Sequence, residues 1–296
     1  MVSRRKALGA LATAAGVIAG APRRSAAATL PAANSSATVG RLKQSVCRWP
    51  YARTPLPEFC RRARRIGLTA VDLLFPDEWP VAQDAGLTVS LGYPSRRDKF
   101  IEAGFNDPAN HRLLLTELET VLPLAARARV PNVIAMFGNR VPGLDDEAAV
   151  ANCVAGLGLI APLAAEHGVT ICVELLNSRV NHPGYQGDHT AFGVAVVKAV
   201  GSPRVKLLYD IYHMQIMEGD VTRTIRGNID WIGHFHTGGV PDRHEINDSQ
   251  ELNYRAIART IADLGYAGYL AHEFAPTRSD PFVSLEEAFE ICKYDP

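Results

Sequence analysis

Short apolar runs alternate with longer amphipathic segments along the chain from Leu42 onward. The runs consist largely of β-branched or other apolar residues, as buried parallel strands do. They lie at Ser45–Cys47, Ala70–Phe75, Thr88–Leu91, Asn132–Met136, Thr170–Leu175, Val205–Asp210, Trp231–His236 and Tyr269–Phe274. The intervening segments repeat their apolar residues at helical spacing. They lie at Pro57–Ile66, Trp79–Asp84, Arg112–Ala128, Asp145–His167, Ala191–Val200, Val221–Asn228, Tyr254–Leu264 and Leu285–Cys292.

This alternation of eight strands with eight helices predicts a closed parallel barrel, in a single domain that spans residues 42–296. Such a (β/α)8 or TIM barrel typically takes about 250 residues. An open doubly wound sheet has the same alternation and is the alternative fold. It is disfavoured because no glycine-rich dinucleotide-binding loop follows any of the predicted strands.

The first 28 residues differ in composition from the rest of the chain. Arg4 and Arg5 precede an apolar, alanine-rich stretch that ends in three alanines at 26–28. This order resembles a twin-arginine export signal cleaved after Ala28, and it predicts an exported, periplasmic protein. Residues 29–41 are rich in alanine and serine and predict a linker. The apolar stretch is too short for stable membrane insertion, which needs about 20 strongly apolar residues.

Charge and cysteine content narrow the possible functions. The whole chain has 31 basic and 31 acidic residues, but its first 28 residues carry five basic residues and no acid. The remainder is therefore acidic by five charges, which argues against nucleic acid as a partner. Five widely spaced cysteines without a Cys-x-x-Cys pair predict neither a disulfide framework nor a zinc knuckle. The sequence leaves a homo-oligomer open.

Candidate chemistry lies at the ends of the last four predicted strands, where the sites of parallel barrels collect. Glu174, Asp210, His236 and Glu273 stand there, about one strand–helix unit apart. Three uncompensated acids at one barrel mouth would repel one another, so these four residues predict the ligands of one divalent cation. Carboxylate oxygens with one imidazole nitrogen favour Mg²⁺ or Mn²⁺ and allow Zn²⁺, Co²⁺ or Fe²⁺.

Residues around these ligands are candidates for supporting roles. Strand alternation puts His234 on the same side as His236, either as a core histidine or as support for that ligand. Asn177 and Glu251 are weaker candidates for positioning. The aromatic residues expected to line a pocket or to lie in the core are Trp49, Phe75 and Trp79.

Several motifs carry a resemblance to a known family. They are Glu-Leu-Leu-Asn from Glu174, Tyr-Asp-Ile-Tyr-His-Met-Gln from Tyr209 and Ile-Gly-His-Phe-His-Thr-Gly-Gly from Ile232. The chain resembles the hydroxypyruvate isomerase family, within the xylose isomerase-like TIM barrels. The resemblance implies interconversion of hydroxypyruvate and tartronate semialdehyde, with Glu174 and Glu273 acting both as metal ligands and as the acid/base pair. It also implies that His213 and Arg243 contact the substrate.

The chemistry of such a reaction agrees with these residue types. Moving a carbonyl along a carbon chain requires a proton to leave one carbon and another to reach its neighbour, through an enediolate whose charge must be stabilised. Two carboxylates beside a metal ion can do this. Arg243, in a loop seven residues after His236, is also placed to grip a substrate carboxylate.

Three other functions remain open at this stage. His236 stands where hydroxypyruvate isomerases often carry glutamine and is similar to the histidine of ketose 3-epimerases, so an exported ketose epimerase or isomerase is the first alternative. Metal-dependent phosphodiester hydrolysis occurs on the same barrel, but it requires more clustered histidines and a basic face. A non-catalytic sugar-binding protein is the third.

Overall fold

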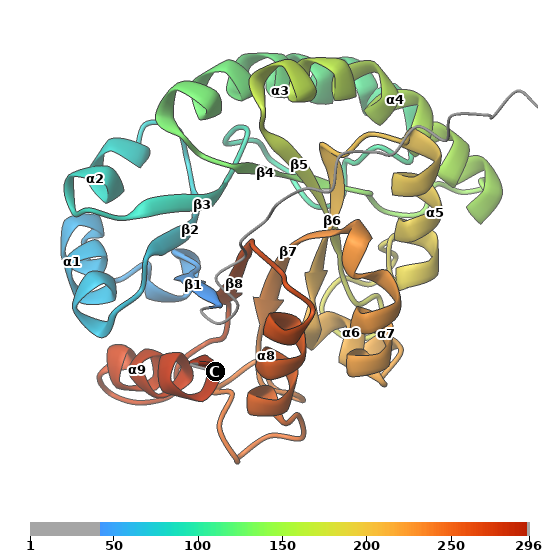
Figure 1. The fold of residues 1–296 in the computed structure, drawn as a ribbon. Coiled ribbons are helices and arrows are strands. Elements are labelled where there is room, and N and C mark those ends of the chain that lie inside the picture. Colours follow the sequence, from blue (N-terminus) through green and yellow to red (C-terminus); the bar gives the residue numbers. More distant parts are fainter. Residues whose placement is uncertain (1–41, 295–296) are drawn as a thin grey trace, which may run out of the picture. The chain divides into compact units, whose positions relative to one another are not determined.

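The strands of this protein form the inner wall of a barrel and the helices surround them (Figure 1). The structure is a computed structural model that describes residues 42–294, so the predicted leader and linker lie outside it. The strands are β1 (Lys43–Val46), β2 (Ala70–Leu74), β3 (Thr88–Gly92), β4 (Asn132–Met136), β5 (Thr170–Leu175), β6 (Val205–Asp210), β7 (Ile232–Thr237) and β8 (Tyr269–His272).

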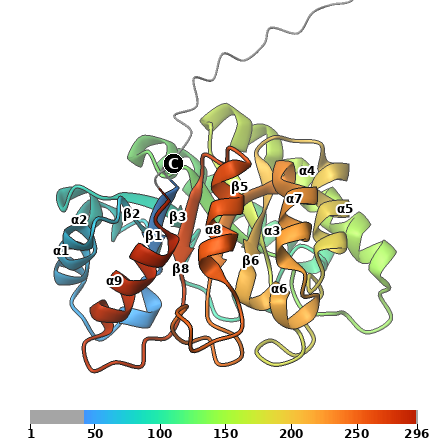
Figure 2. The ribbon, with the colours of Figure 1, turned by 60° about the horizontal axis from the view of Figure 1, so that its bottom comes forward.

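The helices follow the strands in turn and cover their outer surface (Figure 2). The α-helices are α1 (Leu56–Ile66), α2 (Trp79–Asp84), α3 (Pro108–Ala128), α4 (Asp146–His167), α5 (Thr190–Val200), α6 (Ile211–Met217), α7 (Val221–Asn228), α8 (Tyr254–Asp263) and α9 (Pro281–Cys292). Two short 3-10 helices lie at η1 (Trp49–Tyr51) and η2 (Ile229–Trp231). Of these, α6 is a helix that the hydrophobic pattern did not predict.

All neighbouring strands are parallel, and their order runs β1-β8-β7-β6-β5-β4-β3-β2. The two end strands, β1 and β2, meet through a bridge between Cys47 and Asp72. Backbone hydrogen bonds also join them, from Arg48 N to Asp72 O at 3.0 Å and from Thr69 N to Gln44 O at 3.4 Å. The barrel is therefore nearly closed. This confirms the predicted TIM barrel in one domain and excludes the open doubly wound sheet, in which the end strands would lie apart.

Capping residues explain where the predicted helix boundaries shift. Asp107 accepts a hydrogen bond from Ala109 N, so α3 begins with Pro108 and not with Arg112. Asp280 caps α9 in the same way, ahead of a proline in the first turn. An acidic cap satisfies a free amide, and proline at the first helical position lacks the amide that would be free. The last strand, β8, is shorter than the predicted run Tyr269–Phe274. It ends at His272, so Glu273 lies directly after the strand.

The longest apolar helix, α4, passes between α3 and α5 on the outside of β5. Its length and composition would suffice to cross a membrane. In the fold, however, seven of its residues are buried, among them Cys153, Leu157 and Ile160. The apolar character of α4 therefore reflects the barrel core. All five cysteines belong to the described residues, and each is a buried free thiol.

Candidate metal centre and substrate cavity

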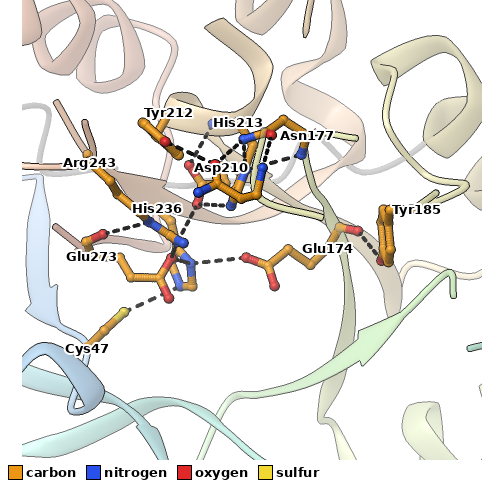
Figure 3. Close-up of polar contacts among 12 residues, drawn as sticks. Cys47, Glu174, Asn177, Tyr185, Asp210, Tyr212, His213, His236, Arg243 and Glu273 are labelled. Atoms are coloured by element: carbon orange, nitrogen blue, oxygen red, sulfur yellow. Dashed lines mark hydrogen bonds and ion pairs between the residues drawn. The ribbon is translucent and has the colours of Figure 1, made fainter. Parts of the chain in front are cut away.

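The four predicted metal ligands meet at the carboxyl end of the barrel (Figure 3). Glu174, Asp210 and His236 lie in the last part of β5, β6 and β7, and Glu273 directly follows β8. One ligand atom from each lies within 4.8 Å of the others, and all four residues are buried. The spacing that indicated a common site in the sequence therefore corresponds to a cluster in space.

The ring of His236 presents its Nδ1 atom to the carboxylates. Nδ1 lies 2.8 Å from Glu273 Oε2 and 3.4 Å from Glu174 Oε1, yet it has no hydrogen-bond partner of suitable geometry. A buried nitrogen without a partner is costly, and a cation at this point would satisfy it. Three carboxylates and one imidazole fit a divalent metal ion, so the residues present are suited to the cofactor that the sequence predicts.

The acids of the cluster differ in their electrostatics. Burial raises the pKa of Glu174, and it raises the pKa of Asp210 to about 7. Burial also opposes ionisation of Glu273, but Arg243 and His236 outweigh it and hold the pKa of Glu273 well below its ordinary value. Two carboxylates on the same site thus have pKa values shifted in opposite directions, an arrangement found in acid/base pairs.

Arg243 is the cation nearest to these acids. Its Nη2 lies 2.5 Å from Glu273 Oε2 and 3.3 Å from Asp210 Oδ2, and its Nε donates to the carbonyl of Glu273 at 3.3 Å. The guanidinium also lies over the rings of Trp49 and Tyr212, 5.3 Å from each centroid. Arg243 has a φ of 59°, so a left-handed backbone turns this loop residue inward. It borders the cavity in which a substrate would lie.

His213 is more deeply buried than a residue that contacts a substrate in the cavity would be. It is buried in α6 beside Asp210, with Nε2 3.5 Å from Asp210 Oδ2. Its Nδ1 accepts a hydrogen bond from the backbone N of Asn177 at 3.1 Å, which leaves Nε2 as the protonated nitrogen. That Nε2 has no partner of its own. Burial keeps the pKa of His213 well below its ordinary value, so the ring is a neutral donor beside the cluster.

The opposite edge of His236 contacts a residue that the sequence reasoning missed. Asp72 Oδ2 lies 2.9 Å from His236 Nε2 and also 2.9 Å from His234 Nε2. His234 therefore belongs to a hydrogen-bonded chain that reaches a candidate ligand, and its supporting role there stays a prediction. The available signal was an acid inside the apolar run Ala-Val-Asp-Leu-Leu-Phe, since ionisable groups are rarely fully buried without a partner.

A cavity of about 590 Å³ opens next to the cluster. Glu174, Glu273 and Arg243 lie on its inner side. Its aromatic lining comes from Trp49, Phe75, Tyr93 and Phe100. The Trp49 indole donates to Glu273 Oε1 at 2.7 Å, while the Phe75 and Tyr93 rings stack with centroids 4.8 Å apart.

Two of the residues singled out from the sequence lie elsewhere. Trp79 is buried in the core, where its indole donates to the carbonyl of Leu74 at 3.1 Å. Glu251 is exposed, accepts a hydrogen bond from Gln215 at 3.1 Å and lines a separate surface hollow. The expected positioning role of Glu251 is therefore wrong: it lies in the long loop before α8, which carries it away from the strand ends.

Comparison with known proteins places this arrangement in a family. A family model described as xylose isomerase-like TIM barrel matches residues 60–293. The chain belongs to this family. It is 32% identical over 251 residues to the putative hydroxypyruvate isomerase of Mus musculus, an alignment that covers 80% of this chain and 90% of that protein.

Two further relatives differ in name and coverage. The chain is 41% identical over 120 residues to the 2-oxo-tetronate isomerase of Cupriavidus necator, covering 40% of this chain and 45% of that protein. A crystal structure of an AP endonuclease, family 2, from Brucella melitensis superimposes with a TM-score of 0.73 at 28% identity, covering 82% of this chain and 97% of that one. The relatives confirm the family resemblance and the predicted class of enzyme, an isomerase.

Proposed function

We propose that the protein is a metal-dependent isomerase that interconverts hydroxypyruvate and tartronate semialdehyde through an enediolate. The observation that carries the proposal is the pair Glu174 and Glu273, which border one cavity and have pKa values shifted in opposite directions. Its relatives of similar length include a putative hydroxypyruvate isomerase. A divalent cation held by Glu174, Asp210, His236 and Glu273 would polarise the substrate carbonyl and stabilise the negative charge of the enediolate.

The two glutamates divide the proton transfers between them. Arg243 favours the ionised form of Glu273, so its carboxylate suits the removal of a proton from the hydroxymethyl carbon. Glu174 borders the same cavity, and burial raises its pKa, so its carboxyl group suits the return of a proton to the neighbouring carbon. The hydroxyl proton passes from one oxygen of the enediolate to the other. In the reverse direction the roles exchange.

Cationic and hydrogen-bonding side chains around Glu174 and Glu273 position the substrate and the two glutamates. Arg243 uses Nη2 and Nε for its contacts with Glu273 and Asp210, which leaves Nη1 to bind a substrate carboxylate at the cavity. His213 does not border the cavity, so its predicted contact with the substrate is replaced by a supporting role: its protonated Nε2 lies 3.5 Å from Asp210 Oδ2 and would orient that ligand. Trp49 keeps Glu273 in place by its 2.7 Å hydrogen bond.

Solvent exchange provides the test. Purified protein loaded with Mg²⁺ or Mn²⁺ is incubated with hydroxypyruvate in deuterated water, and incorporation of deuterium and formation of tartronate semialdehyde are followed by NMR. We expect both in the parent, and strong loss of both in Glu174→Gln and in Glu273→Gln. A metal-loaded parent that neither exchanges nor isomerises hydroxypyruvate would contradict the proposal.

The size of the cavity favours one second candidate, a ketose or keto-sugar isomerase or epimerase with the same proton chemistry. At about 590 Å³ the cavity exceeds the needs of a three-carbon acid, since one water takes about 30 Å³. Beyond Arg243, the arginines of its lining already have partners: Arg96 pairs with Asp77 at 2.6 Å, Arg97 pairs with Glu117 at 2.9 Å, and Arg48 donates to backbone carbonyls, among them that of Thr54 at 2.8 Å. The outer part therefore suits a neutral group. Parallel assays with ketohexoses separate the two, because turnover of the sugar alone would select this candidate.

The remaining alternatives have their own tests. Phosphodiester hydrolysis is disfavoured by the acidic excess of the chain after its first 28 residues. A sugar-binding protein without activity would bind its ligand equally well after Glu174→Gln and Glu273→Gln.

Export through the twin-arginine signal is a further proposal from residues 1–28. Retention of an Arg4→Lys, Arg5→Lys double variant in the cytoplasm, with the parent in the periplasm, would support it; identical distribution would contradict it.

A further inference from the structure

The edge of His236 that faces away from the three acids is bound by one carboxylate. Asp72 Oδ2 lies 2.9 Å from His236 Nε2, and both side chains are fully buried. An imidazole nitrogen that contacts a carboxylate at this distance carries a proton, because a carboxylate only accepts. In the neutral ring the lone pair is then on Nδ1, the atom that faces Glu174 and Glu273 without a hydrogen-bond partner.

Asp72 is itself held on several sides. Ser90 Oγ donates to its Oδ1 at 2.6 Å, and His234 Nε2 contacts its Oδ2 at 2.9 Å. The Cys47 thiol lies 3.6 Å from Oδ2 and 3.7 Å from His236 Nε2. All four of these side chains are buried, so the carboxylate has no solvent-facing rotamer to adopt. The direction of the His236 ring is therefore determined by a group that cannot swing away.

The backbone of β2 is irregular at this point. Its register with β3 shifts on both sides of Asp72, and the next residue, Leu73, has a φ of 58°. Bulges of this kind redirect a side chain, and leucine adopts a left-handed conformation only where the surrounding structure imposes it. Here Asp72 reaches the histidines inside the barrel while Leu73 lines the substrate cavity. A regular strand would send two successive side chains to opposite faces.

We propose that Asp72 is the positioning residue of the metal centre. It keeps His236 as the Nε2-protonated ring and aims the Nδ1 lone pair at the point where Glu174, Asp210 and Glu273 meet. Histidines that bind metals commonly donate their second nitrogen to a carboxylate, and loss of that partner weakens metal binding. The inference rests on the proposed function only in requiring that the centre binds a divalent cation.

The same residues suggest a competing arrangement. Asp72, His234 and His236 approach one another closely enough to hold an ion of their own. A second ion there would use His236 Nε2 as a ligand, and Asp72 would then be a metal ligand and not a positioning residue. The two arrangements differ in stoichiometry, with one bound ion per chain in the first and two in the second.

The experiment measures metal affinity directly. Metal-free protein is titrated with Mn²⁺ by isothermal calorimetry, in the parent and in Asp72→Asn, with Asp188→Asn as the matched control. Asp188 is another buried acid, bound to Ser178 Oγ at 2.5 Å, and it belongs neither to the cluster nor to the cavity lining. We expect the Kd for Mn²⁺ to rise about 10- to 100-fold in Asp72→Asn and to stay unchanged in the control.

A double-mutant cycle separates positioning from a general structural role. If Asp72 acts through the imidazole, Asp72→Asn should add little to the loss of Mn²⁺ affinity already caused by His236→Gln. Fully additive losses would overturn the proposal. Should Asp72→Asn not fold, Ser90→Ala takes its place, because it removes the 2.6 Å bond that steadies Asp72. A smaller rise in Kd is then expected, and an unchanged Kd would overturn the proposal.

The outcomes also distinguish this inference from the proposed function. A parent that binds no Mn²⁺ would overturn the metal-dependent function together with the inference. A parent that binds one Mn²⁺ with an unaltered Kd in Asp72→Asn would overturn the inference alone. Two Mn²⁺ ions per parent chain, reduced to one in Asp72→Asn, would replace it with the two-ion arrangement.

Discussion

The strands β5–β8 and the strands β1–β4 contribute to one site in different ways. All four candidate ligands come from β5–β8 and stand at the carboxyl ends of these strands. From the first half come groups that surround them: Asp72 on β2 behind His236, and Trp49 after β1 beside Glu273. The aromatic cavity wall around Tyr93 also belongs to the first half.

This division shows which parts of a barrel site can change independently. Residues that hold a cation must meet at one point, which constrains their type and spacing together. Residues that line the outer cavity contact only the part of the substrate that does not react. The family model matches both halves of the barrel, from residue 60 to residue 293, whereas most of the cavity wall outside the cluster comes from the first half. We therefore expect substitutions in that wall to change the preference for a substrate more than the chemistry. The following substitutions test this division, beginning with the largest expected effect.

Loss of either glutamate should have the largest effect. Glu273→Gln and Glu174→Gln keep the shape of the side chain but remove the proton-transfer group, so kcat should fall about 10²- to 10⁴-fold. Steady-state kinetics with metal-loaded protein measure the fall, and circular dichroism checks the fold. If both variants kept most of the parent kcat, the proton-transfer role proposed for these two residues of the second half of the barrel would be contradicted.

Metal affinity should depend on pH through Asp210. Its pKa of about 7 means that a cation must displace a proton from Asp210 below this pH. We expect the Kd for Mn²⁺ to rise by up to about tenfold per pH unit below pH 7, measured by calorimetry. In Asp210→Asn binding should be weaker at every pH but less dependent on it. An equally steep dependence in that variant would assign the proton to another ligand.

The same pKa predicts the sign of a stability change in the metal-free protein. Burial raises the pKa of Asp210 in the folded state above its ordinary value, so the folded protein binds this proton more tightly than the unfolded chain. Its stabilising contribution is complete at low pH and is lost as pH rises through about 7. Asp210→Asn should therefore raise the midpoint of thermal unfolding more at pH 8 than at pH 5. The opposite order would contradict the assignment.

Substitutions in the cavity wall should change KM by a smaller factor, and they should change it for a large substrate more than for a small one. Tyr93 stacks on Phe75 and packs edge-on against Phe100, with centroids 5.3 Å apart, so Phe100→Ala opens the wall without touching the candidate ligands. We expect KM for a ketohexose to rise up to about tenfold, equivalent to about 1.4 kcal/mol, with little change for hydroxypyruvate. Equal changes for both substrates would show that the wall does not discriminate by substrate size.

Glu251→Gln should have the smallest effect. Its side chain is exposed and contacts Gln215, so neither kcat nor Kd for Mn²⁺ should change beyond experimental error. The variant serves as the control for the glutamate substitutions, since it makes the same chemical change outside the cluster. A loss of activity would mean that Glu251 itself takes part in the site.

Hydrophobic periodicity was sufficient to predict eight strands, the parallel barrel and most of the helices. A buried parallel strand is a continuous apolar run and a covering helix has a 3.6-residue period, so both are visible in local sequence. The candidate ligands were visible for a related reason. Each stands at the last or second-to-last position of an apolar run, and the barrel fold brings the ends of such runs together. The helix α6 was missed because it is short and begins at Ile211, directly after the last residue of β6, without an intervening loop.

The sequence by itself therefore determined the barrel and the four residues that gather at its mouth, because each depends on periodic or local patterns. Only the tertiary structure decided that Asp72 lies behind His236 and that Glu251 lies outside the site. A bulge in β2 sets the direction of Asp72, and its partners are 162 and 164 residues away in the chain. Contacts of that kind arise from the closure of β1 and β2 on the rest of the barrel, which no local pattern records.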